Sequence, residues 1–122
     1  MPYSYKYSAD IPFKIKTVGG LALYGKGSVV ALGPEIPGSK AYLWKANPAN
    51  DGIQNLESGK YITAEGTLGD IPQDWDLISV GGDDYNIKIP GTEKAVTIAG
   101  EATIALPLGA DVGQAFKLEF QL

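Results

Sequence analysis

Gln73-Asp74-Trp75-Asp76-Leu77 is the stretch that decides the fold, because its last three residues form a triplet that recurs along the chain. The triplet is an aromatic residue, a spacer and an apolar or aromatic residue. Its three copies are Tyr42-Leu43-Trp44, Trp75-Asp76-Leu77 and Phe116-Lys117-Leu118, whose first residues lie 33 and 41 residues apart. Self-similarity at a period of roughly 20 to 50 residues indicates a repeat architecture. We therefore divide the chain into three units, residues 1–47, 48–82 and 83–122.

Turn residues interrupt the chain about every 8–12 residues, which is typical of an all-β sandwich or barrel. The candidate strands between them are 13–16, 21–24, 28–32 and 42–46, then 53–56, 61–64, a short stretch near 68 and 75–80, then 85–89, 95–98, 103–106 and 115–121. Side chains two residues apart share one face of a strand, so an aromatic strand from each unit can fill the centre of a small barrel. The expected core includes Trp44, Leu77, Ile87, Val96, Phe116 and Leu118.

The composition excludes several kinds of chemistry. The 122 residues suffice for one domain, and 44% hydrophobic with 20% charged residues is typical of a globular chain. Cysteine, histidine and arginine are all absent. Disulfides, zinc–thiolate sites and thiol nucleophiles are therefore excluded, and the usual general base is missing. We predict that the protein is not an enzyme and that it needs no metal or cofactor.

The charge and the apolar runs also limit the partners. A net charge of −4 works against binding to nucleic acid or to an anionic membrane surface. The longest apolar run, Val29 to Leu32, is far too short to span a membrane. The first six residues, Met1-Pro2-Tyr3-Ser4-Tyr5-Lys6, lack the hydrophobic region of a signal peptide. The expectation is a cytoplasmic protein that binds neither nucleic acid nor membrane.

Three units of four short strands, each closed by an aromatic strand, resemble the β-trefoil. In trefoil lectins of the ricin-B type, the repeat closes with Gln-x-Trp. Gln73-Asp74-Trp75 matches this motif, Gln114-Ala115-Phe116 matches it in part, and Lys40-Ala41-Tyr42 departs from it at both ends. The resemblance implies an all-β fold, a single β-trefoil domain of twelve short strands in three pseudo-repeats.

The third unit is similar to the C-terminal repeat of the small β-trefoil protease inhibitors of mushrooms. The similarity lies in residues 85–90, 95–98 and 114–120. Those proteins are typically cytosolic and nearly free of cysteine, which agrees with this composition. The resemblance implies a non-enzymatic protease inhibitor that binds through an exposed loop and carries no cofactor.

Two lysines are candidates for the inhibitory residue. Lys26 lies between Gly25 and Gly27, where a tight hairpin turn is expected. A rigid loop lowers the ordering cost of binding, and trypsin-like proteases have an acidic pocket that accepts lysine. Lys40, in the proline-bearing loop 33–40, is the second candidate, although a surface lysine is usually only solvated. The predicted partner is a protease of the serine or cysteine type.

The alternative function is that of a carbohydrate-binding lectin of the fungal β-trefoil type, with a glycan as partner. Tyr3 and Tyr5 would share one face of an N-terminal strand, where they either pack on the barrel or form an aromatic platform for sugar rings. Asp74 and Asp76 flank Trp75 and should share the outward face, about 7 Å apart. Glycosidase chemistry at this pair would need burial to raise one pKa, which solvated strand positions do not favour.

Overall fold

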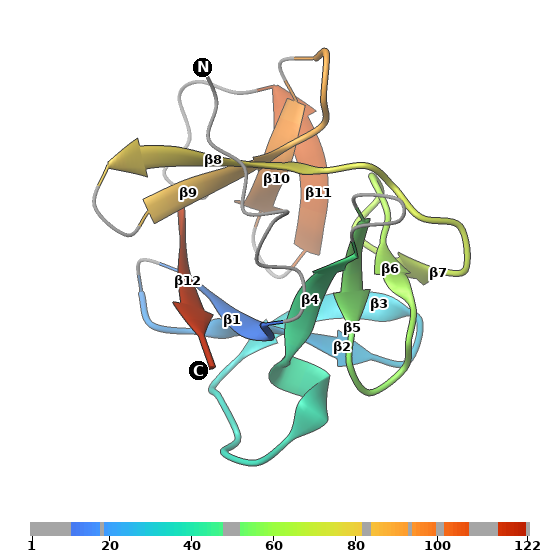
Figure 1. The fold of residues 1–122 in the computed structure, drawn as a ribbon, viewed down its shortest axis with the longest axis vertical. Helices are drawn as coiled ribbons and strands as arrows, with labels where there is room; N and C mark the ends of the chain where they lie inside the picture. Colours follow the sequence, from blue (N-terminus) through green and yellow to red (C-terminus); the bar gives the residue numbers. More distant parts are fainter. Residues whose placement is uncertain are drawn as a thin grey trace.

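The computed structural model describes residues 11–17, 19–47, 52–81, 84–92, 94–99, 102–107 and 115–121. These residues form a curled body whose regular elements are almost all β-strands (Figure 1). The described part contains twelve strands and one short 3₁₀ turn, η2 (Lys40–Tyr42). All twelve predicted strands have a counterpart, within a few residues at each end.

The twelve described strands form three units of four. The first unit contains β1 (Phe13–Thr17), β2 (Ala22–Lys26), β3 (Val29–Gly33) and β4 (Trp44–Asn47). The second unit contains β5 (Gly52–Asn55), β6 (Tyr61–Ile62), β7 (Leu68–Gly69) and β8 (Asp76–Gly81). The third unit contains β9 (Asp84–Lys88), β10 (Lys94–Ala99), β11 (Ala102–Pro107) and β12 (Phe116–Phe120).

Two kinds of antiparallel pairing connect these strands. The first and last strands of the units pair around the centre: β12 with β1, β1 with β4, β4 with β5, β8 with β9 and β9 with β12. The second and third strands form a hairpin in each unit, β2–β3, β6–β7 and β10–β11, which joins the first strand of that unit. This threefold arrangement is the β-trefoil, the fold class that the sequence predicts.

The strand register shows which residues of the three units are equivalent. The corresponding cross-strand pairs are Ala46–Ile53, Leu77–Ile87 and Leu118–Ile15. Two residues earlier along each last strand stand Trp44, Trp75 and Phe116. The predicted triplet is therefore wrong by two residues in the first unit: the aromatic position is Trp44 and not Tyr42, which lies in η2.

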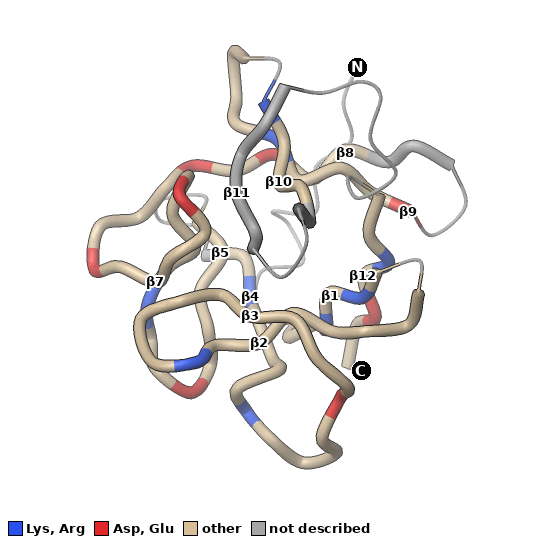
Figure 2. Tube along the Cα trace, turned by 180° about the vertical axis from the view of Figure 1, so that it is seen from behind, with Lys and Arg blue, Asp and Glu red and all other residues tan. Residues whose placement is uncertain are grey.

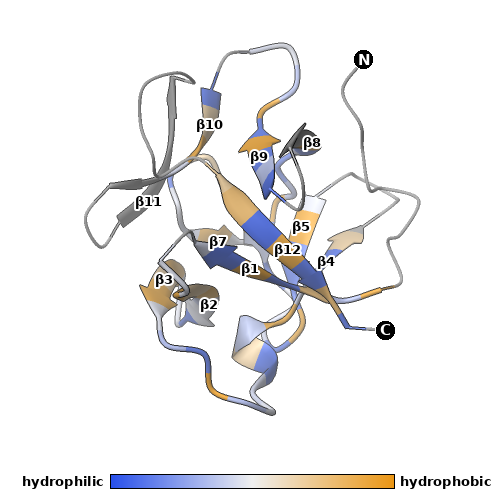
Figure 3. Ribbon diagram, turned by 90° about the vertical axis from the view of Figure 1, so that its left-hand side faces the viewer, coloured by the Kyte–Doolittle hydropathy of each residue, from blue (hydrophilic) through white to orange (hydrophobic). Residues whose placement is uncertain are grey.

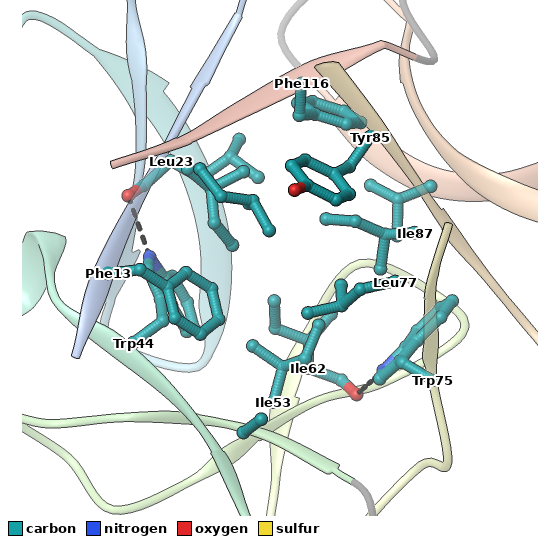
Figure 4. Packing of buried hydrophobic residues seen from close by; sticks show 14 of the residues in the cluster. Phe13, Leu23, Trp44, Ile53, Ile62, Trp75, Leu77, Tyr85, Ile87 and Phe116 are labelled. Atoms are coloured by element: carbon teal, nitrogen blue, oxygen red, sulfur yellow. Dashed lines mark hydrogen bonds between the residues drawn. The ribbon is translucent and has the colours of Figure 1, made fainter. Parts of the chain in front are cut away.

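The two tryptophans repeat one hydrogen bond. The indole N–H of Trp44 donates to the carbonyl of Leu23 at 3.1 Å, and that of Trp75 donates to the carbonyl of Ile62 at 3.0 Å (Figure 4). Leu23 and Ile62 are the second residues of β2 and β6. Each tryptophan thus ties its last strand to the hairpin of its own unit. Phe116 occupies the third equivalent position without an N–H to donate.

The predicted core is confirmed. The six predicted residues are all buried, and none is more than 7% exposed. Apolar and polar side chains alternate along β12, whose burial pattern is buried at Phe116 and Leu118 and exposed at Lys117 and Glu119 (Figure 3). Full burial of a large apolar side chain contributes about 1.5–3 kcal/mol. The six residues come from all three units, so their burial in one core stabilises the packing of the units against one another.

An ion-pair network holds the long loop between β3 and β4 against the barrel. Glu35 pairs with Lys14 of β1 and with Lys16, whose Nζ lies 2.8 Å from the carboxylate. Lys16 also lies 3.1 Å from the carboxylate of Glu119 on β12. The hydrogen bonds from Lys14 and then Lys16 lower the pKa of Glu35 below its ordinary value. Elsewhere acidic and basic residues are interspersed along the chain (Figure 2).

This network predicts a loss of stability in acid. The folded state lowers the pKa of Glu35, so its stabilisation is present above the unfolded pKa and disappears as the pH falls through the folded value, below about 4.5. Glu35→Gln should therefore make the free energy of unfolding less dependent on pH below about 5. Urea unfolding at several pH values measures this. Identical slopes for the variant and the wild type would refute the role of Glu35.

Candidate functional site

The hairpin that carries Lys26 is exposed at its turn but fixed along its backbone. Lys26 is the last residue of β2 and pairs with Val29 across a two-residue turn, in which Gly27 has a φ of 61°. The amide of Leu68 donates to the carbonyl of Ser28 at 2.8 Å, and the amide of Val30 donates to Gly66 at 3.0 Å. The hairpin of the second unit therefore holds this turn in place.

Gly25 and Lys40 occupy different environments. A Cβ on Gly25 would lie 3.0 Å from Leu68 Cδ1 and 3.1 Å from Asn55 Nδ2, so close packing explains the glycine. Lys40 is exposed and begins η2, where the hydroxyl of Ser39 accepts from the amide of Ala41 at 3.3 Å. Lys26, beside the β2–β3 turn, and Lys40, at the start of η2, therefore lie on separate loops.

The predicted sugar-binding residues are only partly within the described chain. Asp74 is exposed just before β8, and Asp76 is half-buried opposite Lys88 of β9. Trp75 between them is buried in the core. Tyr3 and Tyr5 lie outside the described residues, so their predicted platform stays a prediction.

A pocket of about 330 Å³ opens beside these residues in the second unit. It lies between the β6–β7 hairpin and the segment that leads to Trp75, and residues 63–65 and 69–73 line it. Its volume is near the lower end of the range for ligand pockets, roughly 300–1,000 Å³. Sequence reasoning missed this site, because it assigned no structure or function to residues 69–72. Gln73, the first residue of the Gln-x-Trp motif, was the available signal.

The pocket offers both polar and apolar groups. Glu65, Asp70 and Gln73 contribute carboxylate and amide groups. Ile71 and Pro72 contribute an apolar surface, and Ile71 is 82% exposed. Hydrogen-bonding groups beside an exposed apolar surface suit a small ligand that has hydroxyl groups as well as carbon–hydrogen faces.

Local hydrogen bonds hold the walls of the pocket. The hydroxyl groups of Thr63 and Thr67 lie 2.6 Å apart, and the amide of Thr63 donates to the carbonyl of Thr67 at 2.9 Å. On the other side, Lys60 Nζ lies 2.9 Å from a carboxylate oxygen of Asp70. The hairpin side of the pocket is therefore formed in advance of any ligand, which lowers the ordering cost of binding, whereas the exposed Lys60–Asp70 pair contributes little.

The described residues also bear on two other classes of site. Within those ranges, no group of three or more acidic side chains is placed to hold a metal ion. Over the same residues, no helix has the length and apolar character needed to cross a membrane.

No protein-family model and no curated protein matches the chain, but solved structures do. A ricin B-like lectin of Macrolepiota procera, determined in complex with lactose, superposes with a TM-score of 0.75 at 17% identity, covering 88% of this chain and 94% of that one. A designed threefold-symmetric protein, ThreeFoil, superposes with a TM-score of 0.67 at 18% identity, covering 88% of this chain and 97% of that one.

An enzyme also contains a similar domain. A GlcNAcα1-4Gal-releasing endo-β-galactosidase from Clostridium perfringens superposes with a TM-score of 0.75 at 15% identity. The match covers 92% of this chain but only 33% of the enzyme. Together the three structures confirm the β-trefoil and its resemblance to ricin-B-type lectins. None of the three is a protease inhibitor, so that function stays a prediction.

Proposed function

We propose that the protein binds carbohydrate, and that the pocket of the second unit is the binding site. The observation that carries the proposal is the combination of Asp70, Glu65 and Gln73 with the apolar surface of Ile71 in one open pocket. The β-trefoil that presents it is similar to that of a lectin in complex with lactose. The protein would act as a binding module without chemistry of its own.

The chemistry of a sugar ring matches this lining. Carboxylate oxygens accept hydrogen bonds from neighbouring hydroxyl groups, and charge-assisted bonds of this kind are the stronger ones. The carbon–hydrogen face of the ring can pack on Ile71 and Pro72. The described lining contains no aromatic ring, so we expect weak binding of a single sugar, with a Kd on the order of 1 mM.

Asp70→Ala tests the proposal. Removal of a hydrogen bond to a charged group costs about 1.5–3 kcal/mol, so the affinity for lactose should fall by about tenfold or more. NMR titration of the labelled protein with lactose measures the affinity, and a glycan array identifies better ligands. A wild type that binds no sugar in either experiment would refute the proposal.

Two matched variants control for charge and position. Lys60→Met removes the ion pair of Asp70 but leaves its carboxylate, so lactose binding should change little. Asp74→Ala removes a carboxylate just outside the pocket lining and should also have little effect. If Asp74→Ala weakens binding as much as Asp70→Ala does, the site is centred on the predicted aspartates and not on the pocket.

Protease inhibition through Lys26 is the second candidate function. The observation in its favour is that Lys26 is exposed beside a turn held by the hydrogen bond from Leu68 to Ser28. Against it, Lys26 is already paired with Val29, whereas a substrate-like segment needs a free extended backbone. Inhibition of a trypsin-like protease that Lys26→Ala abolishes would favour this candidate. A panel of serine and cysteine proteases left fully active at micromolar concentration would exclude it.

A further inference from the structure

The register of the hairpins extends the equivalence between the first and second units. The pairs that join each hairpin to its first strand are Lys16–Ala22 and Gln54–Tyr61. Since β1 and β5 are already aligned, Ala22 and Tyr61 are equivalent. Two residues further on, Tyr24 corresponds to Thr63. The indole N–H groups of Trp44 and Trp75 donate to the carbonyls of the residues directly before Tyr24 and Thr63. These two hydrogen bonds agree with this alignment.

Gly33 and Gly69 are also equivalent, because they pair with equivalent residues. Ala22 pairs with Gly33, and Tyr61 pairs with Gly69. A Cβ on Gly33 would lie 3.2 Å from the Tyr24 ring, and a Cβ on Gly69 would lie 3.1 Å from Thr63 Cγ2. Gly33 therefore packs closely against the side chain of Tyr24, and Gly69 packs in the same way against the side chain of Thr63.

Tyr42 and Gln73 complete the comparison, because each stands two residues before the equivalent tryptophan. In the second unit, Gln73 and Thr63 line the open pocket. In the first unit, the rings of Tyr42 and Tyr24 are stacked, with centroids 4.8 Å apart and planes 23° apart. Tyr42 is only 4% exposed.

We propose that the ring of Tyr42 occupies the first-unit counterpart of the pocket, so that the space left open in the second unit fits one pyranose ring. The inference rests on the proposed function and adds the size of the ligand and the residues that decide which unit binds it. A tyrosine ring and a pyranose are both six-membered rings with apolar faces. Thr63 and Gln73 take the place of the two rings and leave that volume to a ligand.

Tyr42 is held firmly in this position. Its amide donates to the carbonyl of Ser39 at 3.3 Å, and the side-chain amide of Asn55 donates to the carbonyl of Ala41 at 2.9 Å. Burial raises the pKa of the Tyr42 hydroxyl. The preceding loop is fixed to the barrel through Glu35. A sugar that displaced this ring would have to break these contacts, so the first unit is closed to it.

The third unit differs from both. Thr97 takes the position of Thr63, two residues after Ala95, but it is buried and its hydroxyl donates to the carbonyl of Ala95 at 3.0 Å. Leu106 pairs with Ala95, where the other two units have a glycine. Thr97 is therefore buried, whereas the equivalent Thr63 is half-buried and lines the pocket.

The first test copies the tyrosine pair into the second unit. The double variant Thr63→Tyr, Gln73→Tyr should fold, and its affinity for lactose should fall more than tenfold in an NMR titration. Asp74→Tyr, which adds a ring just outside the lining, should bind lactose like the wild type. If the wild type binds lactose and the folded double variant binds it equally well, this inference is overturned while the proposed function survives.

The second test opens the first unit. The triple variant Tyr24→Thr, Tyr42→Gln, Pro34→Asp gives that unit the Thr–Gln pair and an aspartate directly after the glycine, as in the second unit. We expect lactose to shift the amide signal of Gly33 in this variant and not in the wild type. If the triple variant folds and its Gly33 amide signal does not shift when lactose is added, the inference is overturned. If the wild type itself binds no sugar, the proposed function fails first.

Discussion

Trp75→Ala is expected to lower the free energy of unfolding by about 3–5 kcal/mol, the typical cost of removing a large aromatic side chain from a core. Trp75 is buried directly before β8, where it packs with the core residues shown in Figure 4. Its indole N–H also donates to the carbonyl of Ile62, which the alanine would leave without this partner. Urea unfolding followed by circular dichroism measures the change.

Two control variants separate packing from the hydrogen bond. Trp75→Phe places in the second unit the residue that the third unit has as Phe116, so its cost should be smaller, about 1–3 kcal/mol. Ile36→Ala changes an isoleucine that is 59% exposed and should stay within about 0.5 kcal/mol of the wild type. A loss below about 1 kcal/mol for Trp75→Ala would show that the tryptophan position does not hold the units together.

Asn55→Leu is expected to cost about 2–4 kcal/mol, although asparagine and leucine have similar sizes. Asn55 is 1% exposed, and its side chain satisfies backbone groups on two loops. Its Nδ2 donates to Ala41 at 2.9 Å, while its Oδ1 accepts from the amides of Glu57 and Ser58, both at 3.1 Å. Leucine would leave these backbone groups without their partners.

The register shows that this cost comes from the loops and not from the barrel. The positions equivalent to Asn55 are Thr17 and Ile89, so the barrel accepts a less polar residue there. Gln54→Ala is the matched control, because Gln54 is half-buried and its Nε2 donates to the carbonyl of Gly59 of the same loop at 2.8 Å in an exposed hydrogen bond. Its cost should be about 0.5–1 kcal/mol in the same urea experiment. Equal losses for both variants would contradict the role assigned to Asn55.

Much of the fold could be predicted because the strand pattern is local. The alternation of Phe116, Leu118 and the polar residues between them places β12 correctly, and glycine turns separate the other strands. The one error of register arises because Tyr42 and Trp44 are two residues apart and both aromatic, so either fits the same face of an extended strand. Only the cross-strand pairing of Trp44 with Asn55 decides between them.

The candidate site was harder to predict because it depends on contacts between segments. Residues 69–73 show no regular alternation of apolar and polar residues, so the sequence predicts no strand there. The sequence does give the aspartates beside Trp75, but not that residues 63–65 come together with residues 69–73. Equally, nothing local indicates that Tyr42 stacks on Tyr24, 18 positions earlier in the chain.

An NMR titration of the isotope-labelled wild type with lactose tests the central claim most directly. The account predicts saturable shifts at the amides of Gly69 and Asp70 and at the side-chain amide of Gln73, with unchanged signals for Gly25 and Gly33. Shifts that cluster at Gly25 and Gly33, or no saturable shift at any residue, would contradict it.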